Sequence, residues 1–362
     1  MSHACYLVTG GAGFIGSWFV LRTRAADTAR VVTLDALTYA GNPENLASLR
    51  DDSGHVFVRG DIGDAPLLAD IFRRHRPTAV LNFAAESHVD RSIHDPDAFV
   101  RTNVLGTTAL LRESLAYWRS LAPAEQAAFR FLHVSTDEVF GSLGPTDPPF
   151  TERTPYAPNS PYSASKAASD HMVRAFYETY GLPVLLTNCS NNYGPRQFPE
   201  KLIPLMILNA LAAKPLPVYG RGDNVRDWLH VEDHCMAVQA VLDKGRIGET
   251  YAVGGRSEVS NIELVRTLCA LMDRRVPRQS GSHADAITYV TDRPGHDLRY
   301  AIDCAKIETE LGWTRTHDFA DGLAATLDWY LANREWVERV RSGAYRDWLD
   351  TNYKNRQAPE DS

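Results

Sequence analysis

The chain contains 362 residues and carries a formal net charge of −7 at pH 7. This length exceeds what one hydrophobic core usually supports, and the acidic balance argues against a general nucleic-acid-binding surface. The five scattered cysteines lack C-x-x-C spacing, which predicts reduced thiols and neither disulfides nor a metal site. No apolar stretch could span a bilayer, and an early strand leaves no room for a signal peptide. We therefore expect a soluble, cytoplasmic protein without a membrane or nucleic-acid partner.

A short apolar strand at residues 5–9 precedes the glycine-rich sequence GGAGFIG. Its glycines fit two forms of a dinucleotide-binding motif, G-x-G-x-x-G at Gly11, Gly13 and Gly16 or G-x-x-G-x-x-G at Gly10, Gly13 and Gly16. Either form predicts a tight turn, close approach of a pyrophosphate and close packing of the following helix against its strand. That helix begins near Phe14, where its free amides and dipole favour a phosphate.

The second predicted strand, residues 30–34, ends at Asp35, about 20 residues after the last glycine of the motif. A carboxylate at this place binds the adenosine ribose diol and repels a 2′-phosphate. The sequence therefore predicts NAD, in preference to NADP, as the cofactor.

Further strands extend the same arrangement. A strand at residues 56–60 ends at Asp61 and Ile62, a suitable edge for an adenine. The next strand, at residues 78–83, opens into small residues that let a cofactor lie close to the backbone, followed by Ser87. Ser87 is placed to contact either the nicotinamide ribose or the substrate.

A helix predicted from Asp97 to Leu115 carries Thr102 and Asn103 on its face. Strands and helices thus alternate without a tandem repeat. This alternation predicts an α/β fold built on a doubly wound parallel sheet, the Rossmann arrangement.

The apolar strand at residues 131–135 leads directly into Thr136, Asp137 and Glu138. In open parallel sheets, ligands bind at the carboxyl ends of the strands. Adjacent residues of an extended strand point to opposite faces, so both acids reach one ligand only if the chain turns here. Two carboxyl groups can then transfer protons, provided that Asp137 keeps its proton through a raised pKa.

Tyr162 and Lys166 form a Tyr-x-x-x-Lys pair, which a helix places one turn apart on the same face. A cation this close favours the phenolate, so we expect the tyrosine to act as a base well below its usual pKa. An ordinary helix face would show the same spacing, but the upstream dinucleotide motif and the neighbouring acids favour a catalytic site. An oxidation base beside two carboxyl groups suggests a redox step coupled to an elimination.

The alternation weakens after the strand at residues 184–187, and polar loops become common. We expect a Rossmann domain over residues 1–190 and a smaller, mixed substrate-binding lobe over 191–356 that is interleaved with it, followed by a disordered tail over 357–362. A proline-rich loop at 145–162 cannot be a helix interior. It either covers the active site or is a plain connector.

Basic residues in the second lobe are candidates for binding a diphosphate, for which guanidinium groups are well suited. The candidates are Lys201, Arg226, Arg256 and Arg293. Taken singly, each is more often part of a surface ion pair, and both interpretations stay open.

Seven blocks of the chain resemble the nucleotide-sugar 4,6-dehydratases, and more narrowly the dTDP-glucose 4,6-dehydratases, of the extended short-chain dehydrogenase/reductase superfamily. The blocks are GGAGFIG, AAESHVDRSI, VSTDEVFG, YSASK, NCSNNYGPRQFPEKLIP, RDWLHVEDH and DRPGHDLRYAID. The similarity extends from about Tyr6 to about Trp348. Related sugar epimerases share the tyrosine and lysine but need no acid pair to expel a hydroxyl, so the Thr-Asp-Glu block is the most specific.

The resemblance implies a role for each residue at a matching position. Tyr162, tuned by Lys166 and helped by Thr136, would take the C4 hydroxyl proton while the C4 hydride moves to NAD. Glu138 would abstract the C5 proton, and Asp137 would protonate the departing C6 hydroxyl. Hydride return to C6 would then give a 4-keto-6-deoxyhexose.

Two sets of binding residues are expected on the same basis. The NAD-binding set is Gly10, Gly13, Phe14, Ile15, Gly16, Asp35, Thr38, Asp61, Ile62, Phe83, Ala84, Ala85, Ser87, Thr102, Tyr162, Lys166 and Asn192. The set that binds dTDP-glucose is Ser87, Thr136, Asn191, Lys201, Arg226, Asn261, Arg293 and His296. Members of the family are usually homodimers, and no metal is expected at the site.

Three other functions stay open from the sequence. A UDP-sugar 4,6-dehydratase shares most of these motifs, so the nucleotide base is the least certain part of the substrate. A nucleotide-sugar 4-epimerase shares the fold and cofactor, but the acid pair argues against it. A non-catalytic NAD-binding regulator would have no need of an intact Tyr, Lys, Asp and Glu set.

Overall fold

The computed structural model describes residues 4–340 of the chain. The predicted tail at 357–362 lies outside the described residues. No helix within residues 4–340 is long and apolar enough to cross a membrane.

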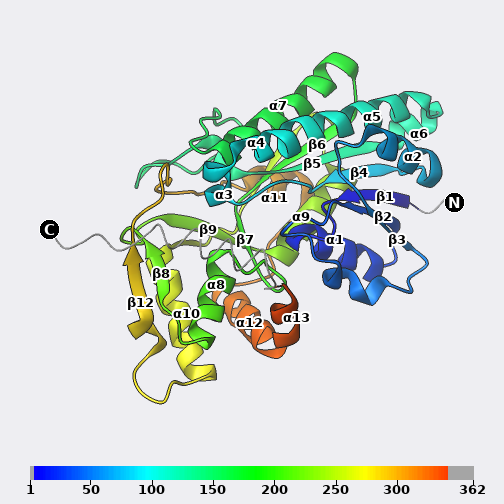
Figure 1. The fold of residues 1–362 in the computed structure, drawn as a ribbon. Coiled ribbons are helices and arrows are strands. Elements are labelled where there is room, and N and C mark those ends of the chain that lie inside the picture. The colour runs from blue at the N-terminus through cyan, green and yellow to red at the C-terminus, as the bar shows by residue number, and fades with distance from the viewer. Residues whose placement is uncertain (1–3, 341–362) are drawn as a thin grey trace.

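A seven-stranded sheet forms the larger part of the structure, and all of its neighbouring strands are parallel (Figure 1). The strand order is β10-β6-β5-β4-β1-β2-β3. The strands are β1 (Ala4–Thr9), β2 (Ala29–Asp35), β3 (His55–Arg59), β4 (Ala79–Asn82), β5 (Arg130–Thr136), β6 (Val184–Cys189) and β10 (Thr250–Val253). The central strands are apolar runs because both faces of a parallel sheet are covered. The predicted doubly wound sheet is confirmed.

Helices cover both faces of this sheet, and each layer closes its own apolar cluster (Figure 1). One layer contains α2 (Ala65–His75), α3 (Val89–His94), α4 (Pro96–Phe99), α5 (Thr107–Ser120), α6 (Pro123–Ala128) and α7 (Pro161–Tyr180). The other contains α1 (Phe14–Ala25), α9 (Val231–Lys244) and α11 (Ala305–Leu311), with the 3-10 helix η1 (Pro43–Leu49) beside α1. The buried side chains Phe131 and Leu111 belong to the first cluster, and Phe19 and Val238 belong to the second.

The helix predicted from Asp97 to Leu115 is present without a break, but its middle part is π-helical. The π-helix η2 (Val100–Gly106) lies between α4 and α5, and its wider turns carry Thr102 and Asn103. Asn103 accepts the Glu86 amide at 2.9 Å and donates to the Glu86 carbonyl at 2.9 Å. These bonds fix the segment that follows β4 against the helix layer.

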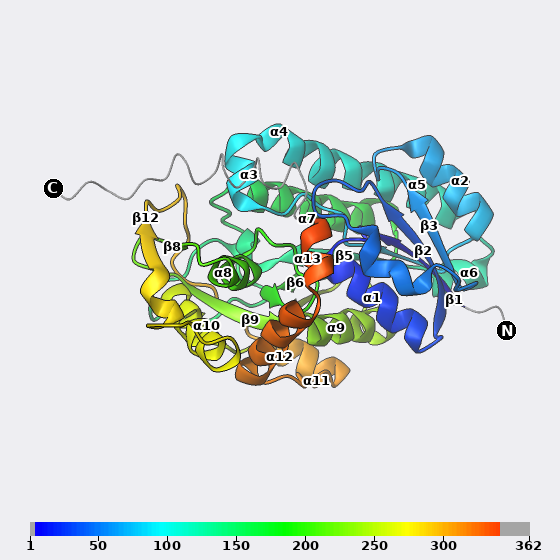
Figure 2. The ribbon, with the colours of Figure 1, turned by 60° about the horizontal axis from the view of Figure 1, so that its bottom comes forward.

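A smaller lobe contains two further sheets, and this mixed lobe is also as predicted (Figure 2). In the first sheet, β9 (Val225–His230) pairs antiparallel with β11 (Glu258–Ser260) and parallel with β7 (Asn191–Tyr193). In the second, β8 (Leu216–Tyr219) and β12 (Ile287–Val290) are parallel. The helices of the lobe are α8 (Leu202–Leu211), α10 (Asn261–Arg275), η4 (His283–Ala286), α12 (Phe319–Ala332) and α13 (Arg334–Val340).

The two parts are connected by several crossings of the chain. β10, α9 and α11 come from beyond residue 190 in the sequence, yet they pack in the layers of the large sheet. In return, the Trp336 indole of α13 donates to the Asn45 side chain at 3.0 Å. The predicted division at residue 190 remains a prediction, because the chain crosses between the two parts more than once.

The proline-rich loop before α7 is fastened to the chain near residue 300. The Leu143 amide donates to the Arg299 carbonyl at 3.0 Å, and the Phe150 amide donates to the Ala301 carbonyl at 2.8 Å. Within the part of the chain that the structure describes, no residue between 141 and 160 lines either of two adjoining cavities near the carboxyl ends of the strands. This placement favours a plain connector over a loop that covers the active site.

Candidate active site

The chain turns immediately after β5, as the acid pair requires. Thr136 is the last residue of the strand, and the short 3-10 helix η3 (Asp137–Phe140) follows directly. The Thr136 hydroxyl accepts the Glu138 amide at 3.3 Å and caps this turn. The turn breaks the strand alternation, so Asp137 and Glu138 line the same cavity.

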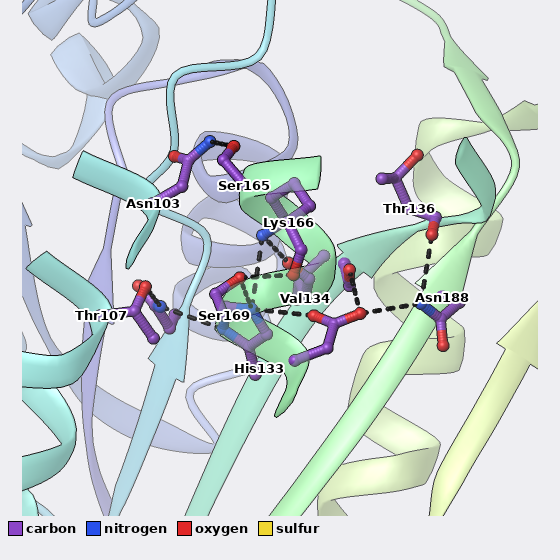
Figure 3. A network of polar contacts seen from close by, with 12 residues as sticks. Asn103, Thr107, His133, Val134, Thr136, Ser165, Lys166, Ser169 and Asn188 are labelled. Carbon is purple, nitrogen blue, oxygen red and sulfur yellow. Dashed lines mark hydrogen bonds and ion pairs between the residues drawn. The ribbon is translucent and has the colours of Figure 1, made fainter. Parts of the chain in front are cut away.

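The start of α7 sets the position of the tyrosine and the lysine. The Ser160 hydroxyl caps the helix, which places Tyr162 in the first turn and Lys166 one turn later. Both side chains are buried and line the cavity that holds the acid pair. Lys166 Nζ donates to the Val134 carbonyl at 2.9 Å, which ties the helix to β5 (Figure 3).

The pKa of Tyr162 moves in the direction opposite to the predicted one. Burial raises this pKa well above its ordinary value, and the Glu138 carboxyl raises it further. A hydrogen bond with Thr136 acts in the lowering direction. The prediction that Lys166 holds Tyr162 as a phenolate is therefore wrong for the described chain, because desolvation dominates and the ammonium donates to a backbone carbonyl.

The two acids have different electrostatic surroundings. Burial raises the pKa of Asp137 well above its ordinary value, and the neighbouring Glu138 adds to this effect. Burial also raises the pKa of Glu138, but the charges of Arg293, Arg226 and Lys201 lower it. Asp137 Oδ2 is buried without a hydrogen-bond partner among the described residues. Asp137 is thus the better proton donor and Glu138 the better base.

A cavity of about 290 Å³ lies over the carboxyl ends of β1, β2, β4 and β5. The structure places every residue predicted to bind NAD on its wall: Gly10, Gly13, Phe14, Ile15, Gly16, Asp35, Thr38, Asp61, Ile62, Phe83, Ala84, Ala85, Ser87, Thr102, Tyr162, Lys166 and Asn192. These residues come from seven segments that are far apart in sequence, most of them strand ends and helix starts, and the sheet brings them together.

The glycine-rich turn and Asp35 fit a dinucleotide. A Cβ at Gly16 would collide with the Gly10 carbonyl oxygen, and Gly10 itself has a φ of +67°. The Asp35 carboxylate accepts the Ala12 amide at 2.9 Å and the Leu37 amide at 2.8 Å, which orients it at the end of β2. A carboxylate fixed in this way suits a ribose diol and excludes a 2′-phosphate.

A second cavity, of about 180 Å³, adjoins the first and is lined from the smaller lobe. Of the residues predicted to bind the sugar nucleotide, it is lined by Ser87, Asn191, Lys201, Arg226, Asn261, Arg293 and His296, while Thr136 lines the first cavity. Glu138 lines both cavities, so the reacting groups lie where the two meet.

The second cavity has the character of an anion site. Lys201 donates to the Ser87 carbonyl at 2.9 Å, and Arg226 lies over the Tyr300 ring at 4.2 Å and donates to the Asp297 carbonyl at 2.9 Å. Arg293 Nε is buried without a hydrogen-bond partner among the described residues. Arg226 is buried, and Lys201 and Arg293 are half-buried. Three cations on the wall of one cavity suit a ligand with more than one negative charge.

One predicted candidate is not brought to the site, and other residues there were missed. Arg256 forms an ion pair with Glu308 at 2.6 Å and lines neither cavity. Glu200 lines both cavities and pairs with Arg91 at 3.0 Å, and Tyr300 lines the second. A glutamate next to Lys201 looks like half of a surface pair in sequence, and only its burial distinguishes it.

One group of potential metal ligands lies away from both cavities. His230, Glu232 and His317 bring ligand atoms within 4.8 Å of one another. The two imidazole rings stack with 3.9 Å between their centres, so their nitrogen lone pairs do not point to a common centre. The third potential ligand, Glu232, already forms an ion pair with Arg22 at 3.2 Å. This geometry suits a helix cap at the start of α9 better than a metal centre.

The adjoining cavities define the class of the protein. It is an enzyme that holds a dinucleotide and an anionic second ligand against one buried set of proton-transfer groups, on a fold of the short-chain dehydrogenase/reductase type.

Comparison with known proteins identifies the family. Residues 7–326 match the family described as GDP-mannose 4,6 dehydratase. A dTDP-glucose 4,6-dehydratase of Xanthomonas campestris pv. campestris (strain B100) is 63% identical over 344 residues, which cover 95% of this chain and 97% of the relative. The dTDP-glucose 4,6-dehydratase 1 of Escherichia coli (strain K12) is 55% identical over 359 residues, covering 97% and 99%.

A solved structure supports the same assignment. The crystal structure of a dTDP-glucose 4,6-dehydratase from Streptomyces venezuelae, with NAD bound, superposes with a TM-score of 0.83 at 48% identity. The superposition covers 93% of this chain and 99% of that structure. The chain belongs to the family of nucleotide-sugar 4,6-dehydratases, and the predicted resemblance is confirmed.

The buried Asp137 generates a prediction about stability. Because its pKa is raised in the folded state, the folded chain retains a proton that the unfolded chain has lost above about pH 4. The wild type should therefore lose stability as pH rises from about 4 towards the folded-state pKa. Asp137→Asn, which resembles the protonated acid, should melt several degrees higher than the wild type at pH 7 to 8 and equally at pH 4.

Thermal unfolding over a pH series measures this difference. Asp51→Asn, at an exposed position on the surface, is the matched control and should leave the whole curve unchanged. An equal melting temperature for Asp137→Asn and the wild type at every pH would contradict a protonated Asp137.

Proposed function

We propose that this enzyme converts dTDP-glucose into dTDP-4-keto-6-deoxyglucose and water with NAD as a bound, regenerated cofactor. The observation that carries the proposal is the position of Asp137 and Glu138 beside Tyr162 at the junction of the two cavities. An epimerase would need only the tyrosine and the lysine. The different surroundings of the two acids are those required to remove one proton and supply another.

The chain's own residues account for the proton transfers. Tyr162 accepts the proton of the C4 hydroxyl. Thr136 forms a hydrogen bond with the phenol, and Lys166 lies one turn away on α7. The resulting 4-ketone acidifies C5–H, and Glu138 takes that proton. Asp137 gives its proton to the C6 hydroxyl, which leaves as water.

The remaining chemistry closes the cycle. Bound NAD supplies the hydride acceptor for C4, the hydride donor for C6 and a cationic ring that favours the phenolate. Glu138 returns its proton to C5, and the proton gained by Tyr162 balances the one lost by Asp137. The cofactor therefore ends in the state in which it began.

The second cavity accounts for binding of the nucleotide. Lys201, Arg226 and Arg293 supply positive charge for a diphosphate, and Asn261 lies beside them at the start of α10. Close relatives named for dTDP-glucose support thymidine as the base, against the uridine alternative. We therefore propose that the residues predicted to bind the sugar nucleotide bind dTDP-glucose.

A comparison of substrates tests the proposal. The protein should turn over dTDP-glucose to a 4-keto-6-deoxy product much faster than it turns over UDP-glucose, without net formation of NADH. Mass analysis of the products and absorbance of reduced nicotinamide measure both quantities. NADH that accumulates in step with product would indicate an ordinary dehydrogenase, and an epimerised sugar would restore the epimerase.

Variants of the acid pair separate the steps. Asp137→Asn keeps its shape but cannot deliver a proton, so oxidation should persist while elimination slows by about 10²–10⁴-fold. Glu138→Gln should suppress exchange of C5–H with solvent deuterium. Turnover in heavy water followed by mass analysis at C5 measures both effects, with Asp51→Asn as the surface control. Undiminished elimination in both variants would remove the acid pair from the mechanism.

We also propose that two copies of the chain form a homodimer. The side chains of Val100 and Leu105 on η2 are 47% and 60% exposed, which is unusual for large apolar residues near a buried site. A second copy that covers this segment would bury them. Because η2 also carries Thr102 of the cofactor cavity, such an interface would stabilise the site.

Sedimentation tests this arrangement. The wild type should sediment as a dimer, and Leu105→Lys should weaken the dimer at least about tenfold because it places a charge in an apolar contact. Tyr289→Lys, at a position 47% exposed on β12, is the control and should leave the dimer intact. A monomeric wild type would contradict the proposal.

The cysteines support the expected cytoplasmic location. All five, Cys5, Cys189, Cys235, Cys269 and Cys304, are free and buried. Free thiols are typical of a reducing compartment, and nucleotide sugars are small, charged substrates. We therefore assign the enzyme to the cytoplasm.

A further inference from the structure

The Lys166 amine lies in a poorly solvated place, with 3% of its surface exposed. Its Nζ donates to the Val134 carbonyl at 2.9 Å and lies 3.4 Å from His133 Nε2 (Figure 3). Neither group is an anion, and burial lowers the pKa of this lysine. An ammonium ion in these surroundings needs a negative charge nearby.

Asp170 supplies that charge from the next turn of the same helix. Tyr162, Lys166 and Asp170 are spaced four residues apart on α7, so they lie along one face. The Asp170 side chain is 2% exposed, and its charge raises the pKa of Lys166 against the effect of burial. Its Oδ2 accepts three hydrogen bonds, from Ser135 Oγ at 2.7 Å, Tyr156 OH at 2.9 Å and Asn188 Nδ2 at 3.3 Å.

The hydrogen-bond network determines which nitrogen of His133 carries the proton. Thr9 Oγ1 donates to Asn82 Oδ1 at 2.6 Å, so the Asn82 amide group must donate to His133 Nδ1 at 3.1 Å. The proton therefore lies on Nε2, which donates to Ser169 Oγ at 3.2 Å, because that hydroxyl gives its own proton to the Lys166 carbonyl; Nε2 also lies 3.3 Å from Asp170 Oδ1. His133 thus lies beside the second oxygen of the carboxylate, which accepts no hydrogen bond within the part of the chain that the structure describes.

Asp170 is the anion among the described groups that face the lysine. On β5, burial and the charge of Lys166 lower the pKa of His133 to about 4, so the imidazole is neutral at pH 7. On β6, burial raises the pKa of the Cys189 thiol, and on α7 burial raises that of Tyr162. His133 and Cys189 carry no negative charge near neutral pH, and Tyr162 gains one only when bound NAD favours its phenolate, which leaves the carboxylate.

We propose that Asp170 and His133 are positioning residues for the reaction: the Asp170 carboxylate keeps Lys166 protonated beside Tyr162, and the His133 imidazole orients that carboxylate. Neither residue lines either cavity, so both act through the lysine. The inference rests on the proposed function, because it concerns how Lys166 supports oxidation at C4.

The test isolates the oxidation step. Single-turnover formation of reduced nicotinamide from dTDP-glucose is followed over a pH series in the Asp137→Asn background, where elimination is slow. That background also removes the titration of Asp137, so loss of rate at high pH reports the lysine. Asp170→Asn is then added, because asparagine keeps the shape and removes the charge.

The expected result is a shift of the alkaline limb of the pH–rate profile, which is the pH range where the rate falls at high pH, and not an equal fall in rate at every pH. Without the anion, Lys166 loses its proton at lower pH, so the limb should move down by about one pH unit. The rate should fall about tenfold on the alkaline side and little below the limb. His133→Asn, which removes the Nε2 donor, should move the limb in the same direction by a smaller amount.

Ser169→Ala is the matched control. Ser169 is equally buried on α7 and contacts His133, but it is uncharged, so its loss should leave the limb in place. Rates that fall by one factor at every pH in both Asp170→Asn and His133→Asn would overturn the proposal. If Asp170→Asn does not fold, the limb in His133→Asn decides the outcome in the same way.

A measurement without turnover completes the test. The chain has few lysines, so with ε-¹³C-labelled lysine the Lys166 signal is identified by its loss in Lys166→Arg. This signal should titrate at lower pH in Asp170→Asn than in the wild type, and an unchanged titration would overturn the proposal. Failure of the wild type to form any reduced nicotinamide, with the lysine titration shifted as expected, would instead count against the proposed function alone.

Discussion

The properties of the active site depend on the burial of ionisable side chains at the carboxyl end of β5. Asp137, Tyr162 and Lys166 are each less than a tenth exposed, and burial is the largest influence on the pKa of all three. Burial favours the neutral form of every such group. The site can therefore keep a proton on Asp137 without further help, but it needs nearby partners to keep any group charged.

Those partners come from different parts of the fold. The smaller lobe supplies the cations Arg226 and Arg293, which lower the pKa of Glu138 and offer donors to an anionic ligand. The helix layer supplies Asp170, whose charge opposes the effect of burial on Lys166. The same cations can thus tune the base and bind the substrate, so a bound diphosphate and an active Glu138 are electrostatically linked.

The crossings of the chain between the large sheet and the smaller lobe explain why residues from both parts keep their relative positions in this site. β9, which carries Arg226, leads directly into α9 on the face of the large sheet, and β10 then returns to the edge of that sheet beside β6. Strand β6 in turn lies next to β5. The arginine and the acid pair are therefore connected through packed helices and paired strands.

The sequence alone determined the features that depend on local pattern. The glycine-rich turn, Asp35 at the end of its strand and the spacing of Tyr162 and Lys166 each follow from a few neighbouring residues, because strand and helix periodicity act over that range. The apolar strands likewise predicted the parallel sheet. The block of Thr136, Asp137 and Glu138 indicated the chemistry, since its residue types are those that the reaction requires.

Only the tertiary structure decided the electrostatics. The pKa of Tyr162 was predicted in the wrong direction, because the sequence shows a nearby lysine but not the burial that outweighs it. Arg226 and Arg256 look alike in sequence, yet one is buried over Tyr300 and the other pairs with Glu308 at the surface. Desolvation depends on segments that are distant along the chain and meet only on folding, which is why local pattern does not reveal it.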